Sequence, residues 1–364
     1  MQLQFVIKAL SLQGGGAERV LCEICSELAE RGHSVEIISF DQPRSVDFYP
    51  LDQRVGRIRL GIGRIDAPSS IGEFARRVRA LRSLLLAKRP DVAVGFMHSG
   101  FVTLAVAGLG TIPVIASEHT VYEHYRERPL EKLLIRAIAP LCTAFTITLD
   151  NVRRGFPDSI ARRMTVIPDP VTLRPELPES RDHDRQRLLF VGNFRPEKGH
   201  RTLISAFGRL AAENPTWDLR LVGEGELRLE VERQVRDLGL QSRISFAGAV
   251  ADVSREYAAA DLFVVPSAYE SFGLATAEAL ASGLPVVGFA DCPATSQLVQ
   301  DGCNGILVSG SDRAGALAQG LRRLMSSIEL RKSLGRSGPA SVQAYSIKSV
   351  VDKWEQLLRS VGLP

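Results

Sequence analysis

The 364-residue sequence lacks an uninterrupted apolar run of the roughly 18 residues that a membrane-spanning helix requires. Its best candidate, LAVAGLGTIPVIA, is broken by Gly108, Gly110 and Pro113. The N-terminus, MQLQFVIKAL, enters an apolar run with no basic leader and no small-residue cleavage site, which predicts a first strand and not a signal peptide. We therefore expect a cytoplasmic protein that does not span a membrane.

Cysteine is scarce, with five residues scattered along the chain, and this favours reduced thiols over a disulfide framework. Cys22 and Cys25 form a CxxC inside a helical pattern with no second ligand pair nearby, so we expect a buried helix face and not a zinc or redox site. Asp182 and Asp184 flank a histidine in a polar linker, where a solvated charge cluster is expected. The sequence predicts no metal and no cofactor.

Acidic residues are sparse in one part of the chain, although the formal net charge is only +4. Residues 54–89 contain ten lysines and arginines against two acidic residues. Within them, residues 71–89 predict an amphipathic helix with arginines on one face and an apolar face made of Ile71, Phe74, Val78, Leu81, Leu84 and Leu85. A core-packed helix with a solvated basic face is the simpler interpretation, and docking on an anionic membrane surface is the sharper one. No nucleic-acid partner is expected.

Short apolar runs alternate with helical patterns in both halves of the chain. They are QFVIKAL, VEIISF, VAVGF, PVIASEH, FTITL and MTVIPDP in the first half, then RLLFVGNF, LRLVGEG, ISFAGAV, LFVVPS, PVVGFAD and GILV. Such strands predict parallel sheets covered by helices on both faces. A proline-rich and charged join at residues 168–187 separates two α/β doubly wound domains, which we place at residues 1–172 and 173–345. Ligands of such sheets bind at the carboxyl ends of strands, so we expect a site in a cleft between the domains.

One of these strand ends carries the stretch YESFGLATAEALASGLPVV, residues 269–287. Ser271 is the expected N-cap of a helix from about Phe272 to Ser282, and Gly283 the expected left-handed residue after it. A helix that opens with SFGL presents unpaired amides, which suit an anion such as a phosphate.

Two carboxylates bracket this helix start. Glu270 stands at the lip of the strand, and Glu278 sits about two turns into the helix, where it could accept paired hydroxyls from a ribose. The simpler interpretation is that both carboxylates only offset the helix dipole.

The stretch FVGNFRPEKGH, residues 190–200, ends another predicted strand. Arg195 and Lys198 near the following helix start form a plausible diphosphate clamp that would neutralise a leaving group without a metal. Ordinary surface charge is the alternative, although cations at a helix start are misplaced unless an anion joins them.

Two strand ends in the first domain are further candidates. LSLQGGGAERV, residues 10–20, is a glycine-rich turn that matches neither GxGxxG nor the P-loop, so it is either a ligand-approaching turn or simply a tight one. His119 in ASEHT ends a strand and faces the expected cleft, though a lone histidine is more often a hydrogen-bonded structural residue.

Together these motifs resemble the family-4 retaining glycosyltransferases of the GT-B fold. The E-x7-E element is present from Glu270 to Glu278, DGCNGILV follows at residues 301–308, and GGGAER, SEHT, VGNFRPEKG and LVGEGEL occur in the family's order. The resemblance implies two Rossmann-like domains facing across a cleft. It also implies a last helix at residues 346–364, containing IKSVVDKWEQLLRS, that crosses back onto the N-terminal domain.

The resemblance also implies roles for individual residues. Glu278 resembles the carboxylate that holds the nucleotide ribose, and Glu270 the one near the donor sugar hydroxyls. His119 resembles the histidine that contacts the transferring sugar. The remaining donor contacts would be the amides of Phe272, Gly273 and Leu274, the cations Lys198 and Arg195, and the loop residues Gly15 and Gly16.

One position departs from the family pattern. Many relatives have arginine directly after the glycine that corresponds to Gly192, whereas Asn193 stands here. Either Arg195 substitutes from a shifted position or the clamp relies more on Lys198.

The resemblance implies transfer of a hexose or N-acetylhexosamine from a nucleoside-diphosphate sugar, with UDP as the expected nucleotide, to a glycan or lipid-linked acceptor. Retention in this family is usually explained by front-face attack, which needs neither a metal nor a covalent nucleophile. The enzyme would be cytoplasmic, with peripheral attachment to the inner face of the membrane as an option.

Two other functions stay open at this point. An NDP-sugar 2-epimerase of the same fold is disfavoured by the E-x7-E element with its FGL helix start. A non-catalytic sugar-nucleotide-binding subunit is disfavoured by the intact Glu270, Lys198 and Glu278.

Overall fold

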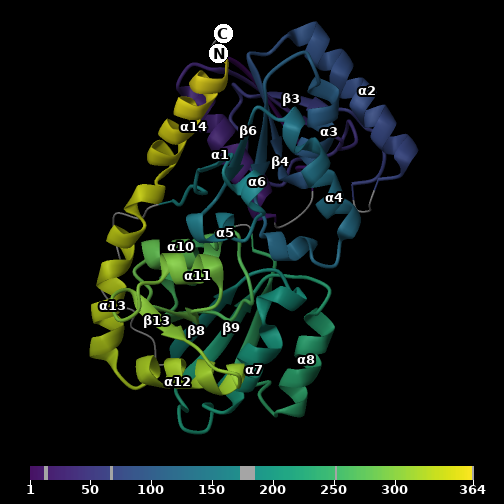
Figure 1. Cartoon of the computed structure of the whole chain (residues 1–364). Helices are drawn as coiled ribbons and strands as arrows, with labels where there is room; N and C mark the ends of the chain where they lie inside the picture. Colours follow the sequence, from purple (N-terminus) through teal and green to yellow (C-terminus); the bar gives the residue numbers. More distant parts are fainter. Residues whose placement is uncertain (12–14, 66–68, 173–184, 251, 363–364) are drawn as a thin grey trace. The chain divides into compact units, whose positions relative to one another are not determined.

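The computed structural model describes residues 1–11, 15–65, 69–172, 185–250 and 252–362 (Figure 1). It divides into two compact units. Unit 1 comprises Met1–Pro170 and Ile347–Pro364, and unit 2 comprises Val171–Ser346. The first glycine of the GGG turn and the triplet Asp182, His183 and Asp184 lie outside the described residues.

Unit 1 is built on a seven-stranded sheet of order β3-β2-β1-β4-β5-β6-β7 in which neighbouring strands are parallel. Its strands include every apolar run predicted for the first half of the chain. They are β1 (Gln2–Ile7), β2 (Ser34–Ser39), β3 (Gly56–Arg59), β4 (Val92–Phe96), β5 (Val114–Glu118), β6 (Ala144–Ile147) and β7 (Met164–Val166). The edge strand β3 was not predicted, because its sequence GRIR has one apolar residue and all four positions are only half-buried.

The helices of unit 1 follow the strands in alternation. They are α1 (Gly16–Glu30), α2 (Ile71–Lys88), α3 (Met97–Gly108), α4 (Pro129–Ile138), α5 (Asp150–Arg153), α6 (Asp158–Ala161) and α14 (Ile347–Gly362), with the 3-10 turns η1 (Tyr122–Tyr125) and η2 (Ala139–Leu141). The last helix, α14, returns to unit 1 and packs against α1 and β4 (Figure 1). Its buried Trp354 stacks on Phe96 with ring centroids 6.0 Å apart.

Charged contacts also attach α14 to the end of α1. The Arg31 guanidinium donates to Asp352 at 2.6 Å, and His33 Nε2 lies 2.7 Å from Glu355 Oε1. These contacts join residues more than 300 positions apart and hold the C-terminal helix against the end of α1.

Unit 2 is built on a six-stranded sheet of order β10-β9-β8-β11-β12-β13, again with parallel neighbours. The strands are β8 (Gln186–Val191), β9 (Trp217–Val222), β10 (Ile244–Gly248), β11 (Leu262–Val265), β12 (Val286–Phe289) and β13 (Gly305–Val308). The helices are α7 (His200–Gly208), α8 (Arg228–Asp237), α9 (Ser254–Ala258), α10 (Leu274–Ala281), α11 (Pro293–Leu298), α12 (Arg313–Met325) and α13 (Ile328–Ser341), with the turns η3 (Pro196–Lys198) and η4 (Gln343–Tyr345). Their apolar faces close one core that includes Phe190, Phe207, Trp217, Phe289 and Leu321.

Both sheets reverse their strand order beside the first strand of the unit. In unit 1 the reversal lies between β1 and β4, and in unit 2 it lies between β8 and β11. Chain segments that leave two neighbouring strands there run to opposite faces of the sheet and leave a crevice at the carboxyl ends. The turns after β8 and β11 are therefore where the fold itself favours a ligand in unit 2.

The start of α10 differs from the prediction. The helix begins at Leu274, and its N-cap is Gly273 in a left-handed conformation with φ +80°, not Ser271. The end is as expected, because Gly283 has φ +68° directly after the helix. The sequence FGL thus enters the helix through a glycine turn, which no side chain caps.

The prediction that the arginines of α2 form a solvated face is also wrong at one position. Arg77 is buried, stacks on the Phe40 ring at 4.4 Å and donates to the carbonyls of Ile62 and Arg64. Conversely, Ile71, assigned to the apolar face, is 90% exposed. A guanidinium with several backbone acceptors can be buried where the hydrophobic pattern predicts a solvated side chain.

No helix in the described parts of the chain is both long and apolar enough to cross a membrane.

Candidate functional site

The turns that follow β8 and β11 touch each other. The amide of Ala268 donates to the carbonyl of Glu197 at 2.8 Å. Gly199 lies at this contact with φ +71°, and a Cβ there would stand 2.3 Å from the Pro266 carbonyl oxygen. Only glycine combines this conformation with this close approach, so the residue type fixes how the two strand ends meet.

This contact brings Lys198 and Glu270 together. The lysine Nζ lies 2.7 Å from both carboxylate oxygens, and the buried Ser267 hydroxyl donates to Glu270 Oε1 at 2.7 Å. The Lys198 side chain keeps 23% of its surface exposed and the Glu270 side chain 14%. Charge-assisted hydrogen bonds of this length hold both groups in place at the lip of the sheet, where each still has access to solvent.

The first turn of α10 stands next to this ion pair in sequence. Phe272 is buried with its ring edge-on to Tyr345 at 5.3 Å, so its side chain belongs to the core and only its backbone can serve a ligand. Gly273 and Leu274 are half-buried, and no side chain caps the helix start. Amides at an uncapped helix start carry partial positive charge and favour an anion.

Glu278 is held from a neighbouring helix. The hydroxyl of Tyr257 in α9 donates to Glu278 Oε2 at 2.9 Å, and the tyrosine itself is buried with its ring 6.0 Å from that of Phe263. A buried phenol beside a half-buried carboxylate fixes which way the carboxylate points.

The turn after β8 also contains Asn193 and Arg195. Asn193 is half-buried and its carbonyl accepts from the Arg195 amide at 2.9 Å, whereas the Arg195 side chain is exposed. Next to Lys198, the ring of His200 is buried and stacks on Phe194 at 4.2 Å. Burial, and then the charge of Lys198, lower the pKa of His200 to about 4, so at neutral pH this ring adds no charge to the turn.

In unit 1, His119 follows β5 as predicted, and protein atoms surround it. Its Nε2 lies 2.9 Å from the Ser117 hydroxyl, its Nδ1 lies 3.1 Å from Asp169 Oδ1, and its ring stacks on Phe96 at 4.5 Å. The side chain is 6% exposed. The ring is therefore held on three sides, and a ligand would reach it only by exchanging one of these polar contacts.

The preceding residue, Glu118, is buried and accepts from the Tyr125 hydroxyl at 2.7 Å and from the amides of His119 and Thr120. Burial raises the pKa of its carboxyl to about 7, even though these donors oppose the shift. A carboxyl with a pKa of about 7 thus accepts a hydrogen bond from the backbone amide of His119.

Gly15 and Gly16 are at the start of α1, where Gly15 is the N-cap with an ordinary φ of −82°. A Cβ on Gly15 would stand 1.7 Å from the Glu18 carboxylate, which is the end of a flexible side chain and can move, so neither φ nor this contact requires glycine here.

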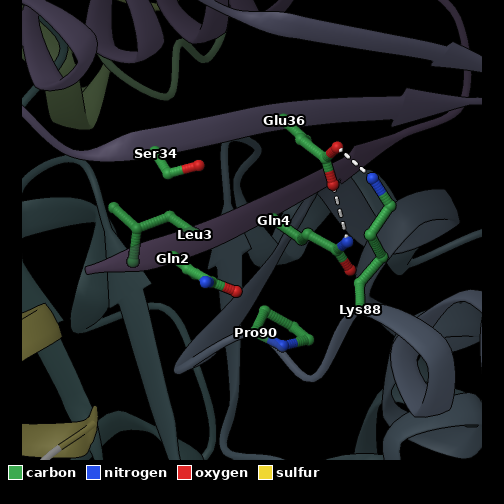
Figure 2. Close-up of a pocket in the computed structure, with 7 residues that line it drawn as sticks. All are labelled: Gln2, Leu3, Gln4, Ser34, Glu36, Lys88 and Pro90. Carbon is green, nitrogen blue, oxygen red and sulfur yellow. Dashed lines mark hydrogen bonds and ion pairs between the residues drawn. The ribbon is translucent and has the colours of Figure 1, made fainter.

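A small cavity of about 260 Å³ lies at the opposite, amino-terminal end of β1 and β2 (Figure 2). Three of its polar side chains bond to one another, with Gln4 Nε2 donating to Glu36 Oε2 at 2.9 Å and Lys88 Nζ to Glu36 Oε1 at 2.7 Å. None of the predicted site residues lines it.

The structure thus brings together Lys198 and Glu270 in unit 2, and it keeps Glu278 and the α10 start in the same strand-end region. Sequence reasoning missed Ser267, Tyr257 and Asp169. Ser267 had a usable signal, because it is the first polar residue after the apolar run LFVVP. Tyr257 and Asp169 had none, because each acts on a partner at least 21 positions away in the chain.

The sequence matches two glycosyltransferase family models, one in each half of the chain. The model of Glycosyltransferase Family 4 matches residues 14–174, and that of Glycosyl transferases group 1 matches residues 176–341. An N-acetylgalactosaminyltransferase of Campylobacter jejuni, named for its action on a diphosphoundecaprenol-linked saccharide, is 26% identical and covers 99% of both chains. An uncharacterized glycosyltransferase of Haemophilus influenzae is 25% identical and covers 94% of this chain and 96% of its own.

Solved structures show the same fold at low identity. Sucrose-phosphate synthase of Thermosynechococcus elongatus superposes with a TM-score of 0.86 at 21% identity, covering 99% of each chain. HepE of Anabaena in complex with UDP-glucose superposes with a TM-score of 0.79 at 19% identity, covering 99% of this chain and 100% of its own. With its two parallel-sheet units and the two family matches in sequence, the chain belongs to the GT-B glycosyltransferases, with a family-4 N-terminal half and a group 1 C-terminal half.

Proposed function

We propose that this glycosyltransferase binds a UDP-sugar in unit 2 and transfers a hexose or N-acetylhexosamine to a glycan or lipid-linked saccharide. The observation that carries the proposal is the Lys198–Glu270 pair at the strand reversal of unit 2. Lys198 supplies a cation that can bind a diphosphate, and Glu270 supplies a carboxylate that can bind sugar hydroxyls. Both lie close in sequence or space to the uncapped start of α10.

Each group of the site has a part in the proposed reaction. Breaking the bond between sugar and diphosphate places negative charge on the departing phosphate, which Lys198 and the amides of Phe272, Gly273 and Leu274 would stabilise. Glu270 would accept hydrogen bonds from hydroxyls of the sugar, and the Ser267 hydroxyl would keep the Glu270 carboxylate in position. No step of this scheme needs a metal or another cofactor.

Glu278 is proposed to hold the ribose. A carboxylate can accept hydrogen bonds from two vicinal hydroxyls. One oxygen of Glu278 also accepts a hydrogen bond from the Tyr257 hydroxyl of α9. Arg195, exposed on the turn after β8, is proposed as an outer contact to the diphosphate, with the half-buried Asn193 as a further donor contact and Lys198 as the main cation.

The stereochemical course is proposed to be retention by front-face attack, in which the leaving phosphate takes the proton of the acceptor hydroxyl. This scheme needs no enzymic nucleophile, so Glu270 is a holder of the sugar. In unit 1, His119 is proposed to contact the transferring sugar, and Gly15 and Gly16 to approach the diphosphate. The fixed ring of His119 supports a positioning part in the reaction.

Two relatives support the choice of donor and acceptor. The HepE structure was solved with UDP-glucose, and the Campylobacter enzyme is named for a lipid-diphosphate acceptor. An acceptor of that kind would place this protein on the inner face of a membrane.

A ligand screen followed by assays with and without acceptor tests the proposal. A thermal-shift screen of nucleoside diphosphates and their sugars should give the largest increase in melting temperature with UDP or a UDP-sugar. The selected donor should then give release of its nucleoside diphosphate only when acceptor is present. Conversion of UDP-N-acetylglucosamine into its 2-epimer without transfer would show an epimerase instead, and donor binding without any turnover would show a non-catalytic subunit.

A further inference from the structure

Asp169 is the carboxylate that faces the ring of His119. It stands between Pro168 and Pro170 in a buried segment that follows β7, and it is itself 5% exposed. Proline fixes its own φ and favours extended backbone in the residue before it, so the two prolines leave Asp169 little conformational freedom. The segment therefore holds a buried carboxylate in one place beside His119.

Each nitrogen of the His119 ring has its own polar neighbour. Nδ1 lies 3.1 Å from Asp169 Oδ1, and Nε2 lies 2.9 Å from the Ser117 hydroxyl. The Thr146 hydroxyl in turn donates to the Ser117 hydroxyl at 2.8 Å, and both of these residues are buried. Thr146, Ser117, His119 and Asp169 thus form one series of polar contacts that runs from β6 to the segment after β7.

This series favours one tautomer of the ring. Because the Ser117 oxygen accepts from Thr146, the Ser117 proton is available to Nε2, which is then the accepting nitrogen. A carboxylate accepts hydrogen bonds and donates none, so Asp169 favours a proton on Nδ1. Both ends of the series therefore favour a neutral ring with its proton on Nδ1 and a lone pair on Nε2.

The other contacts of His119 fix its place but not its tautomer. The Phe96 ring stacks on the imidazole at 4.5 Å, and Glu118 accepts from the backbone amide of His119 at 3.0 Å. Neither contact involves a ring nitrogen. Asp169 therefore has a part that these neighbours do not share.

We infer that Asp169 is a positioning residue for sugar transfer. It keeps the ring proton of His119 on Nδ1, so that Nε2 accepts a hydrogen bond from a hydroxyl of the transferring sugar. The inference rests on the proposed function, in which His119 contacts that sugar. The Ser117 contact is the one that the sugar hydroxyl replaces, because Ser117 is neutral and keeps Thr146, whereas exchange at Nδ1 would take a polar partner from a buried carboxylate.

Nitrogen NMR of the histidine rings tests the tautomer without any donor. The full chain is labelled with 15N-histidine at pH 8, and the His119 signals are identified by their loss in His119→Ala. The wild type should show a ring protonated on Nδ1. Asp169→Asn keeps the size of the side chain but can donate from its amide to Nδ1, so it should shift the ring toward the form protonated on Nε2.

The matched control is Asp47→Asn. It removes the charge of another carboxylate of unit 1, which is half-buried and pairs with Arg57 and Arg59. The control should leave the His119 signals and kcat unchanged. Melting temperatures of all variants verify that each is folded.

Kinetics with the identified donor test the effect on turnover. Asp169→Asn should lower kcat by about tenfold to a hundredfold, with a smaller change in the KM for donor. The same substitution should have no further effect in a His119→Ala chain, because Asp169 acts through the ring.

A wild-type ring protonated on Nε2, or a wild-type tautomer in Asp169→Asn, would overturn the inference. So would a His119→Ala variant with the kcat of the wild type, or an equal loss of kcat from Asp169→Asn with and without His119. Absence of turnover with every UDP-sugar would instead count against the proposed function, and the NMR comparison would still decide whether Asp169 sets the tautomer.

Discussion

Lys198 and Glu270 leave neighbouring strands of the unit 2 sheet, and the lysine Nζ lies 2.7 Å from both oxygens of the carboxylate. The two residues are 72 positions apart in the chain. Their meeting depends on the strand reversal between β8 and β11 and on a glycine that lets the two turns touch. The strand order of the sheet therefore brings the two residues together, at the edge where a ligand is expected to bind.

Replacing Lys198 should separate turnover from binding. Lys198→Ala removes the cation proposed to stabilise the departing phosphate, so kcat should fall by about a hundredfold to a thousandfold while the KM for donor changes much less. Steady-state kinetics with the identified donor measure both. The control is Arg201→Ala, which removes a 70% exposed cation near the start of α7 and should leave kcat unchanged. A KM effect alone for Lys198→Ala would contradict the assigned role.

The ribose contact can be measured with altered nucleotides. Glu278→Ala should weaken UDP binding but leave the binding of 2′,3′-dideoxy-UDP almost unchanged, because the lost hydrogen bonds go to the hydroxyls that the analogue lacks. Tyr257→Phe should weaken UDP binding by about tenfold and reduce the same discrimination in part, since it removes one charge-assisted hydrogen bond to the carboxylate.

Calorimetric titration of both nucleotides gives the comparison. If Glu278→Ala lowers the affinity for UDP and for its dideoxy analogue by the same factor, the carboxylate does not hold the ribose. If Glu278→Ala behaves as expected but Tyr257→Phe equals wild type, the tyrosine does not position it.

Gly199 should be highly sensitive to substitution. Gly199→Ala combines a left-handed φ of +71° with a Cβ 2.3 Å from a carbonyl oxygen, so the free energy of unfolding should fall by about 2–5 kcal/mol. Gly239→Ala is the matched control, because it has φ +67° and no atom within 4 Å, and it should lose only about 1 kcal/mol. Urea unfolding compares the two. Equal losses would mean that the turns after β8 and β11 do not pack tightly.

Glu118 should make the stability of the protein depend on pH. Burial raises the pKa of its carboxyl from the ordinary 4.5 to about 7, so between these values the folded chain keeps a proton that the unfolded chain releases. Raising the pH from 4.5 to 7 should therefore lower the free energy of unfolding, by about 3 kcal/mol for this group, with no further loss above pH 7.

The variant Glu118→Gln removes this titration and keeps a side chain of the same size beside Tyr125. Unfolding of both proteins in urea at pH 5 and at pH 7.5 measures the difference. The wild type should lose more stability than the variant across this interval. Parallel pH profiles would mean that Glu118 is not held protonated in the folded chain.

The parts of the fold that follow from local pattern could be predicted from the sequence. Every apolar run proposed as a strand is one. Most of these strands lie inside a parallel sheet, where burial on both faces favours a continuous apolar stretch. The strand β3 escaped, since GRIR at a sheet edge has no such signature. At α10 the pattern indicated a serine cap, but the chain enters the helix through Gly273, whose positive φ places FGL in a turn that a serine cap does not form.

Features that depend on distant partners could not be predicted. Arg77 belongs to a basic run, and only the fold brings backbone carbonyls and the Phe40 ring around it. The sequence indicated Glu278, but not Tyr257, which orients it from another helix. His119 was placed correctly at a strand end, whereas its contacts with Ser117 and Asp169 emerge only from the packed sheet.

The most direct measurement is the release of nucleoside diphosphate from a panel of nucleoside-diphosphate sugars, incubated with purified protein and a lipid extract as acceptor. We expect release from one UDP-sugar, transfer of its radiolabelled sugar to lipid, and loss of both with Lys198→Ala. Release that is the same for wild type and Lys198→Ala, or no binding of any nucleotide sugar, would contradict a donor site built on Lys198 and Glu270.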